Sequence, residues 1–363
     1  MTRYFMPTKV YWGKDCLTAT SEDFTRLGKR AFIVTGKRSA RLSGALPDLL
    51  PVLEKQKIPY FVYDGISENP ELEDIYRGAV LFKEKECDLL IGIGGGSPID
   101  AAKAISVIAA NDLQGREIYQ PEKIRKAFPL IAIPTTAGTG TEVTPYSVLT
   151  DTKLRKKAGF GNPLIFPLLS FSDPKYTFSL PEKVTVDTAL DALSHLLEGI
   201  YSRSRCDLLF PLIFRGVKDI VQSLPALGKE PENYELRKKL LRASLYGGIV
   251  IAQGGTTLQH SIGYPLTTHY GLSHGMANGV VMKAVMELFS PSLEKELRML
   301  FTGIGFSREE FFDWLAQWLS EEKLSLPESF IEEAAAEIME SRNMAQNPKE
   351  VSLSEIKTIL RSL

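Results

Sequence analysis

The sequence predicts an α/β domain built on an open parallel sheet, followed by an all-helical domain. Three observations predict this fold class: short β-branched runs alternate with helix-patterned stretches in the first half, strand signals fade after Pro181, and long amphipathic patterns follow. We expect domains at 1–178 and 179–363, with the boundary near Asp173–Leu180, where prolines and turn formers lie together.

Four segments of the first half have the composition of buried strands: Ala31–Thr35, Tyr60–Tyr63, Leu89–Gly94 and Leu130–Pro134. Between the second and third of them, Pro70 begins a turn, and apolar residues then recur at helical spacing up to Cys87. Strands joined by helices in this way favour a parallel sheet.

Helical patterns dominate the second half and cover Val184–Tyr201, Tyr234–Gln253 and Ser307–Leu319. Ser307 with Glu310, and Ser352 with Glu355, have the spacing of a helix-opening capping box.

Composition excludes several classes of protein. The 363 residues include 43 basic and 44 acidic side chains, so we expect no nucleic-acid or anionic-membrane partner. The N-terminus has no apolar segment typical of a signal peptide, and no apolar run of about 18 residues follows, so a cytoplasmic location is expected. Cys16, Cys87 and Cys206 are too scattered to predict disulfides or a zinc knuckle.

A glycine-rich turn, GGGSPID at residues 94–100, follows the third predicted strand and leads into a helical run. Glycines allow close approach to a ligand, and the next helix N-terminus offers free N–H groups, so a pyrophosphate fits there. The alternative is a turn that binds nothing, because three glycines are a weaker signal than a full dinucleotide fingerprint.

A second polar loop, PTTAGTGTE at residues 134–142, follows the fourth predicted strand. Its hydroxyls and amides suit phosphate, ribose or a nicotinamide carboxamide, although a threonine-rich turn also satisfies its own backbone. Two such loops at the carboxyl ends of strands in one sheet favour a Rossmann-like dinucleotide-binding domain.

The residues after the first predicted strand bear on the choice of dinucleotide. NAD sites usually place a carboxylate near the ribose hydroxyls, whereas NADP sites leave that position neutral and add cations. Gly36 stands there, followed by Lys37, Arg38 and Ser39. The sequence therefore favours NADP(H) over NAD(H), with ordinary surface charges as the alternative.

A metal site is predicted from the few histidines. Asp191 and His195 are four residues apart in a helical pattern, so both project from one face. Such a pair alone also forms a simple ion pair, but His260 and His274 complete a set of three imidazoles and one carboxylate, which suits Fe²⁺, Zn²⁺ or Ni²⁺. His269 is expected in an exposed loop, without a ligand role.

Together these motifs resemble one family. GGGSPID, PTTAGTGTEVT, DALSHLLEG and the stretch from His260 to Gly275 are similar to the iron-containing (group III) alcohol dehydrogenases, which share their fold with glycerol dehydrogenase and dehydroquinate synthase. The match extends from KVYWG near the N-terminus to NPKEVSLSEIKTIL near the C-terminus. The resemblance implies a homodimer with one divalent metal per chain, Fe²⁺ first and Zn²⁺ next.

Carried over residue by residue, the resemblance implies that the metal ligands are Asp191, His195, His260 and His274. It implies that the cofactor contacts include Gly94, Gly95, Gly96, Ser97, Asp100, Thr135, Thr136, Thr139 and Lys157. One departure concerns proton transfer, because many relatives carry a histidine four residues after the third ligand, where this chain has Tyr264. A tyrosine with an ordinary pKa of about 10 is a poorer acid–base group at neutral pH. Water, the ribose hydroxyls and Tyr264 therefore remain as proton routes.

The expected reaction is hydride transfer between NADP(H) and a small primary alcohol or diol, such as butanol or 1,3-propanediol, or the matching aldehyde. The metal is expected to act as a Lewis acid on the substrate oxygen, in the cleft between the two domains. A zinc- and NAD-dependent polyol dehydrogenase of the glycerol type is the alternative, and Gly36 argues against it. A non-catalytic metal- or nucleotide-binding scaffold is a further alternative, against which the two complete half-sites argue.

Overall fold

A six-stranded parallel sheet forms the centre of the first half of the chain. The computed structural model describes residues 4–20, 22–151, 156–319 and 324–363. The strands of the sheet, in the order β1-β8-β5-β4-β2-β3, have the bounds Lys9–Trp12 (β1), Leu169–Ser172 (β8), Leu130–Pro134 (β5), Leu89–Gly94 (β4), Ala31–Gly36 (β2) and Tyr60–Ile66 (β3). A separate antiparallel hairpin joins β6 (Tyr146–Asp151) to β7 (Lys156–Gly161). The predicted parallel α/β half is confirmed.

All four predicted strands are present, and two of them, β4 and β5, have the predicted bounds. β1 coincides with the segment KVYWG that begins the resemblance, and it pairs in register with β8 at the edge of the sheet. β6, β7 and β8 were not predicted, because each is short and interrupted by polar residues or, in β7, by glycines, which weakens the local strand signal.

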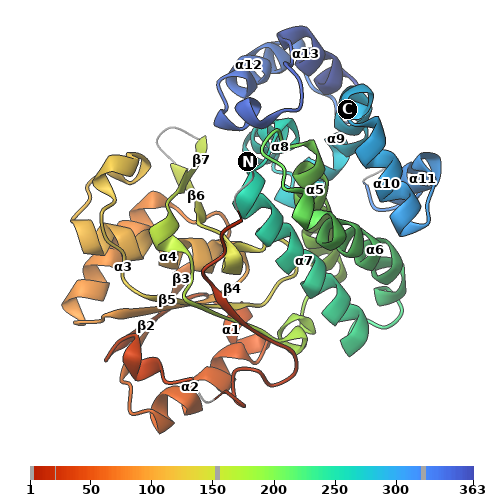
Figure 1. Ribbon diagram of the computed structural model, residues 1–363. Coiled ribbons are helices and arrows are strands. Elements are labelled where there is room, and N and C mark those ends of the chain that lie inside the picture. The colour runs from red at the N-terminus through yellow and green to blue at the C-terminus, as the bar shows by residue number, and fades with distance from the viewer. Residues whose placement is uncertain (1–3, 21, 152–155, 320–323) are drawn as a thin grey trace.

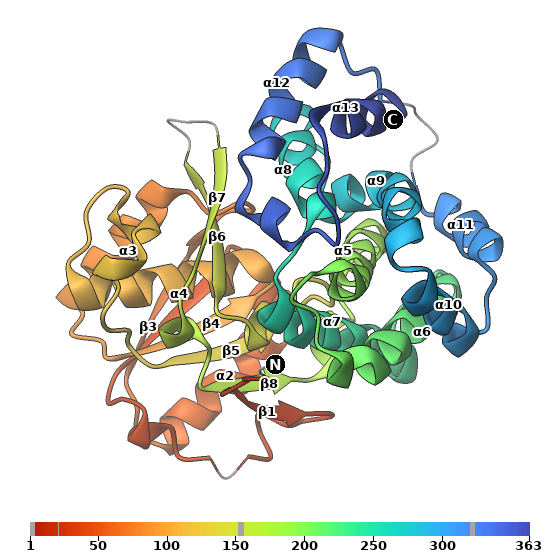
Figure 2. The same ribbon diagram turned by 45° about the horizontal axis from the view of Figure 1, so that its top comes forward.

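Helices cover both faces of this sheet, as Figures 1 and 2 show. They are α1 (Ser39–Leu42), α2 (Ala45–Lys55), α3 (Leu72–Glu84) and α4 (Gly96–Asn111). Side chains of β2 alternate between the layers: Phe32 packs in the core with α3 and α4, whereas Ile33 packs in the core with α2. The helix expected over Pro70–Cys87 is α3, shorter at both ends.

The sheet topology brings the predicted cofactor segments together. β2, β4 and β5 are neighbours, so Gly36, Gly94 and Pro134 at their carboxyl ends lie along one edge. The direction of strand succession reverses between β2 and β4, and ligands of open α/β sheets bind in the crevice at such a switch point.

The second half is helical, as predicted. Its helices are α5 (Glu182–Tyr201), α6 (Phe210–Leu227), α7 (Tyr234–Gly254), α8 (Leu258–Tyr270), α9 (His274–Phe289), α10 (Glu294–Ile304), α11 (Arg308–Ala316), α12 (Glu328–Met339) and α13 (Leu353–Arg361). Both predicted capping boxes are formed, at the starts of α11 and α13. In the described part of the chain, no helix combines the length and apolar character that a bilayer span requires.

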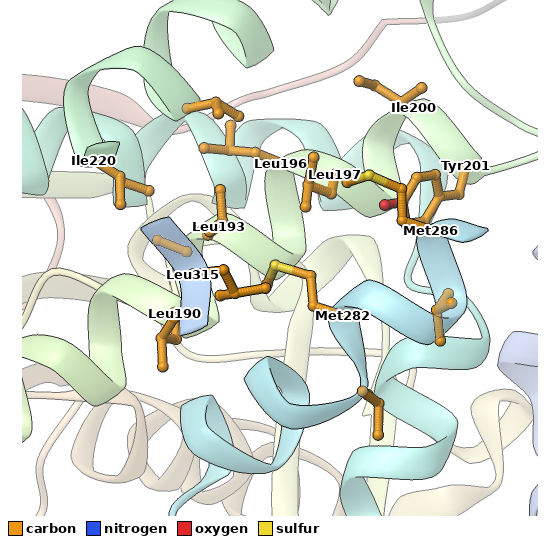
Figure 3. Packing of buried hydrophobic residues seen from close by; sticks show 14 of the residues in the cluster. Leu190, Leu193, Leu196, Leu197, Ile200, Tyr201, Ile220, Met282, Met286 and Leu315 are labelled. Carbon is orange, nitrogen blue, oxygen red and sulfur yellow. The ribbon is translucent and has the colours of Figure 1, made fainter. Parts of the chain in front are cut away.

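Helix α5 is the central helix of this half. It is buried from Ala189 to Tyr201, and it packs against α6, α7 and α9. Figure 3 shows Leu193 and Leu196 in this core together with Ile220 of α6 and Met282 of α9. Surrounding α5 with apolar helices fixes its rotation, and its polar residues therefore have one defined direction.

One local prediction was wrong. His269 lies in the last turn of α8 and not in a loop, although its side chain is exposed as expected. Helix α8 continues to Tyr270 and ends where Gly271 adopts a left-handed conformation, so the connecting loop begins later than the polar sequence suggests.

The connection between the two halves runs from the end of β8 at Ser172 to the start of α5 at Glu182, with a 3-10 helix, η6, at Pro174–Thr177. The boundary predicted between residues 178 and 179 falls in this connection. The division into two domains stays a prediction.

Glycines let the two halves approach each other closely. Gly140, in the second polar loop, has a left-handed backbone (φ +59°) and faces Gly248 of α7, and a Cβ atom at Gly248 would lie 2.3 Å from the Gly140 carbonyl oxygen. A Cβ atom at Gly138 would lie 2.7 Å from Cβ of Thr188 on α5. The loop that follows β5 is therefore pressed directly against the helical half.

We expect Gly248→Ala to lower the free energy of unfolding by about 1–3 kcal/mol, because the added methyl group overlaps the Gly140 backbone. Urea denaturation measures this change. Gly65→Ala, where nothing lies within 4 Å of the new methyl group, is the matched control and should change stability by less than about 0.5 kcal/mol. Equal stability of the two variants would contradict close packing between the halves.

Candidate metal centre and cofactor loops

Helix α5 supplies the first two predicted metal ligands. Asp191 and His195 lie one turn apart on the same face, and His195 Nε2 is 3.8 Å from Asp191 Oδ1. Both side chains are almost fully buried, with 5% and 6% of their surface exposed. The helical spacing therefore places both side chains together in the interior.

Helices α8 and α9 supply the other two predicted metal ligands, His260 and His274. Nε2 of His260 and Nε2 of His274 each lie 3.8 Å from the same Asp191 oxygen. His195 Nε2 and His260 Nε2 are 3.1 Å apart, and the ligand atoms of Asp191, His195 and His260 all lie within 4.8 Å of one another. His274 is equally close to Asp191 but outside that tighter group, and its side chain is 28% exposed. The cluster is therefore accessible from the His274 side.

The donor set fits a divalent metal ion. Nδ1 of His260 is engaged by the Glu198 carboxylate, which leaves the Nε2 lone pair of His260 directed at His195 and Asp191. Two imidazole nitrogens 3.1 Å apart beside one carboxylate oxygen present converging lone pairs. Such a nitrogen and oxygen set suits Fe²⁺, Zn²⁺ or Ni²⁺.

Glu198 supports this cluster and was not predicted. It has no exposed surface, and one of its carboxylate oxygens accepts hydrogen bonds from the Thr257 backbone N–H at 2.7 Å and the Thr257 hydroxyl at 2.8 Å. The other oxygen contacts His260 Nδ1. A carboxylate behind a ligating histidine fixes the tautomer and raises the basicity of the ring. Its position three residues after His195, on the same helix face, was the sequence signal that could have predicted this supporting role.

Asn278, four residues after His274 on α9, is the second unpredicted neighbour. Its side-chain amide nitrogen lies 3.2 Å from Asp191 Oδ1, 3.3 Å from His260 Nε2 and 3.5 Å from His274 Nε2. Asn278 is fully buried. The amide N–H groups therefore stabilise the Asp191 carboxylate and orient it toward the imidazoles.

The electrostatics of Asp191 and His274 favour their metal-binding protonation states, whereas His260 must lose a proton to Glu198 or to solvent when it binds a metal. Burial opposes the charge of Asp191, but the neighbouring imidazoles outweigh burial and lower its pKa. Burial lowers the pKa of His274 to about 3. Burial also disfavours a charged His260, but Glu198 outweighs it and raises the pKa of this ring. An ionised carboxylate and a neutral imidazole are the forms that bind metals.

Tyr264 lies one turn after His260 on α8. Its ring stacks on His274, with centroids 5.5 Å apart and planes at 11°, and meets His260 edge-on at 6.3 Å. Burial, reinforced by the charges of Glu198 and Asp191, raises the pKa of Tyr264. The neutral phenol is therefore strongly favoured over the phenolate at neutral pH.

The two polar loops form one surface at the ends of β4 and β5. The backbone N–H of Thr135 donates to the Gly94 carbonyl at 2.8 Å. A Cβ atom at Gly95 would lie 3.1 Å from the Thr136 side chain, and one at Gly96 would lie 2.9 Å from the Thr139 side chain. The glycines of the first loop therefore make room for the threonines of the second.

The predicted cofactor residues of these loops divide by exposure. Those that reach the surface in part are Gly95, Gly96, Ser97, Thr136 and Thr139, around the N-terminus of α4. Gly94 and Thr135 are buried. The Asp100 carboxylate is engaged within the protein, where it accepts hydrogen bonds from the Thr141 hydroxyl at 2.5 Å and the Val148 N–H at 2.9 Å. Asp100 therefore joins the loops to β6.

Two further predicted cofactor segments flank the loops. After β2, Gly36 is followed by the exposed side chains of Lys37, Arg38 and Ser39. Lys157, on β7, is largely buried, which lowers its pKa, and the charges of Asp191, Glu68 and Asp100 act on it in the opposite direction. Lys157 therefore lies within electrostatic reach of both the predicted ligands and the loop network.

Comparison with known proteins gives a consistent match along the chain. Residues 7–174 match the family model of iron-containing alcohol dehydrogenase, and residues 185–363 match the C-terminal model of the same family. A long-chain primary alcohol dehydrogenase of Thermoanaerobacter ethanolicus is 34% identical over 75% of this chain and 69% of its own length. The crystal structure of an iron-containing alcohol dehydrogenase of Thermotoga maritima is 36% identical, with a TM-score of 0.92 over 100% of this chain and 99% of that one.

Relatives whose names state a cofactor use either dinucleotide. An NADPH-dependent butanol dehydrogenase of Clostridium saccharobutylicum is 28% identical over 90% of this chain and 85% of its own length. An NAD-dependent methanol dehydrogenase of Bacillus methanolicus is 28% identical over 78% of this chain and 75% of its own length.

We expect Glu198→Gln to lower the affinity of the chain for divalent metal about 10- to 100-fold, because the amide no longer draws the His260 Nδ1 proton and His260 becomes a weaker ligand. Titration of metal-free protein with Zn²⁺ or Co²⁺ measures the affinity. Glu182→Gln, at the exposed start of the same helix, is the control and should bind metal like the wild type. Equal affinity of all three proteins would contradict the supporting role of Glu198.

Proposed function

The chain belongs to the iron-containing alcohol dehydrogenase family, and from this membership we propose that it transfers hydride between NADP(H) and a small primary alcohol, a diol or the matching aldehyde. One observation carries the proposal. Gly138 of the second loop packs against Thr188 of α5, which precedes Asp191 by three residues. The candidate cofactor surface therefore adjoins the candidate metal centre, as hydride transfer to a metal-bound substrate requires.

For the metal, we propose a single divalent ion held by Asp191, His195, His260 and His274, with Fe²⁺ preferred and Zn²⁺ next. When bound, such an ion supplies Lewis-acid polarisation of the substrate oxygen. The partial exposure of His274 supports an approach of the substrate from that side, since the other three ligands are enclosed.

For the cofactor, we propose NADP(H) in preference to NAD(H). The partly exposed residues at the N-terminus of α4 suit the pyrophosphate, because free helical N–H groups and the dipole end attract anions. Gly36 adds no negative charge, and the exposed cations of Lys37 and Arg38 suit a 2′-phosphate. The NADPH-dependent butanol dehydrogenase supports this choice, whereas the NAD-dependent relative shows that the fold accepts either dinucleotide.

Residues around the reacting atoms have separate tasks in this proposal. Lys157 lies within electrostatic reach of Asp191 and Asp100, and its ammonium group favours an anionic group of the cofactor. Tyr264 keeps its hydroxyl proton, because its pKa is raised, and it acts as a hydrogen-bond donor and as a wall stacked on His274. Water or the ribose hydroxyls then carry the proton of the product alcohol.

Three predictions accompany the proposed function. We propose primary alcohols and diols such as butanol and 1,3-propanediol as substrates, in line with a butanol dehydrogenase and a 1,3-propanediol oxidoreductase, the latter 25% identical, among the similar proteins. We also propose a homodimer and a cytoplasmic location. The dimeric state is open to measurement by light scattering.

The proposed activity is tested with short aldehydes and NADPH on protein stripped of metal and then reloaded with Fe²⁺, Zn²⁺ or Ni²⁺. We expect turnover to be lost on chelation and restored by at least one of these ions. Asp191→Asn should bind metal weakly and lose activity, because the charged ligand is replaced by a neutral one. Full activity after chelation would rule out the metal-dependent mechanism. Metal and NADPH binding without turnover of any short alcohol or aldehyde would favour a scaffold.

Cofactor choice is tested with the double variant Lys37→Ala/Arg38→Ala. We expect kcat/KM with NADPH to fall about tenfold or more, since a charged hydrogen bond contributes roughly 1.5–3 kcal/mol, while kcat/KM with NADH stays nearly constant. Lys55→Ala, an exposed lysine on α2, is the control. A wild-type preference for NADH, or equal losses with both dinucleotides in the double variant, would contradict the assignment.

A further inference from the structure

A lysine without any exposed surface lies beneath the two polar loops. Lys103 is in the second turn of α4, and its relative exposure is 0%. Removing an ammonium group from water costs several kcal/mol unless its charge and N–H groups find partners. A lysine at this position therefore destabilises the fold unless its ammonium group is paired, and its contacts indicate its role.

The ammonium group of Lys103 binds the end of the second loop. Its Nζ donates to the Thr141 carbonyl at 2.7 Å, the Thr141 hydroxyl at 2.6 Å and the Tyr146 carbonyl at 2.7 Å, and the Thr144 hydroxyl lies 3.2 Å away. Thr141 begins the 3-10 helix η4 (Thr141–Val143), Thr144 follows it, and Tyr146 begins β6. The Lys103 side chain therefore links α4 to three residues between the second loop and the hairpin.

The charge of Lys103 is balanced from its own helix. Asp100, one turn earlier, has a carboxylate oxygen 3.8 Å from Nζ, and the Thr141 hydroxyl bridges the two by donating to Asp100. The nearby Glu142 is also buried, and burial raises its pKa to about 7, so it is only partly ionised at neutral pH and adds a fraction of a negative charge. Asp100 and Lys103 thus form an internal ion pair around Thr141.

This ion pair fixes the second loop relative to the first. The first loop runs directly into α4, so the loop and Lys103 belong to one rigid element. Thr141 comes two residues after Thr139, whose side chain fits against Gly96. The hydrogen bonds from Lys103 hold Thr141 close to α4. They therefore keep the threonines of the second loop in contact with the glycines of the first.

We propose that Lys103 is a positioning residue for the dinucleotide, which acts through Thr141 and Tyr146 to hold Thr136 and Thr139 against Gly95 and Gly96. This inference rests on the proposed function, because it takes the joined loops as the cofactor surface. Lys103 does not touch the cofactor. Its buried ammonium sets the spacing of the groups that do.

The test compares NADPH binding by the holoenzyme and three variants, with fluorescence titration as the readout. Lys103→Met keeps the length of the side chain but removes the charge and the N–H donors. We expect its Kd for NADPH to rise about 10- to 100-fold, with metal content unchanged, because small misplacements of binding groups have effects of this size. The KM for NADPH should rise in parallel, and the KM for the aldehyde should not.

Thr141→Val tests the same role of Lys103 if Lys103→Met does not fold. It removes only the hydroxyl that links Lys103 to Asp100, and we expect the Kd for NADPH to rise about tenfold. Ser106→Ala is the matched control. Ser106 is also buried on α4, and its hydroxyl donates to the Phe128 carbonyl at 2.9 Å, away from the second loop. It should lower stability without changing the Kd.

The possible failures are distinct. Wild-type affinity for NADPH in folded Lys103→Met, or in Thr141→Val when the first variant does not fold, would assign Lys103 a purely structural role and overturn the inference. A wild-type protein that binds neither NADPH nor NADH would instead contradict the proposed function, on which the inference rests.

Discussion

The arrangement of polar groups in the helical half depends on the carboxylate of Asp191, which is buried and therefore needs partners for its charge. It lies 3.8 Å from the Nε2 atoms of three imidazoles, and only the amide of Asn278 donates to it among the contacts described above. A carboxylate in the interior is destabilising unless cations or hydrogen bonds compensate its charge. We infer that a divalent ion shared by the four donors adds to the compensation that the imidazoles and Asn278 provide, so that metal binding also stabilises the fold of this half.

The apolar packing of the helices determines how the polar groups meet at Asp191. Three helices present their polar faces to one point, and the apolar packing of α5 against α6, α7 and α9 sets its rotation. Glu198 extends the cluster by orienting His260, and Gly138 against Thr188 places the second loop beside α5. The proposed metal ligands and the proposed cofactor loops are thus held by one continuous set of contacts, in which the ion pair of Lys103 with Asp100 is the counterpart on the α/β side.

Features that depend on neighbouring residues in the sequence could be predicted, and features that depend on distant contacts could not. The strand Leu89–Gly94 was found with its observed bounds because an apolar run ended by glycines is a local pattern. The Asp191 and His195 pair follows from helical spacing alone. The roles of Glu198 and Lys103 were missed because their partners lie 59 to 62 and 38 to 43 residues away, and a single sequence holds no record of which distant residues meet. The loop glycines were predicted to approach a ligand, whereas several of them accommodate protein side chains and backbone.

We propose that Asp191, His195, His260 and His274 bind one metal ion next to the proposed cofactor loops. Anomalous X-ray diffraction at the iron edge, from crystals of Fe²⁺-loaded protein grown with NADPH, tests it most directly. We expect a single peak within about 2.0–2.3 Å of the Asp191 carboxylate and the three Nε2 atoms, because these are ordinary metal–ligand distances. A peak elsewhere, or none in protein that contains stoichiometric iron, would contradict it.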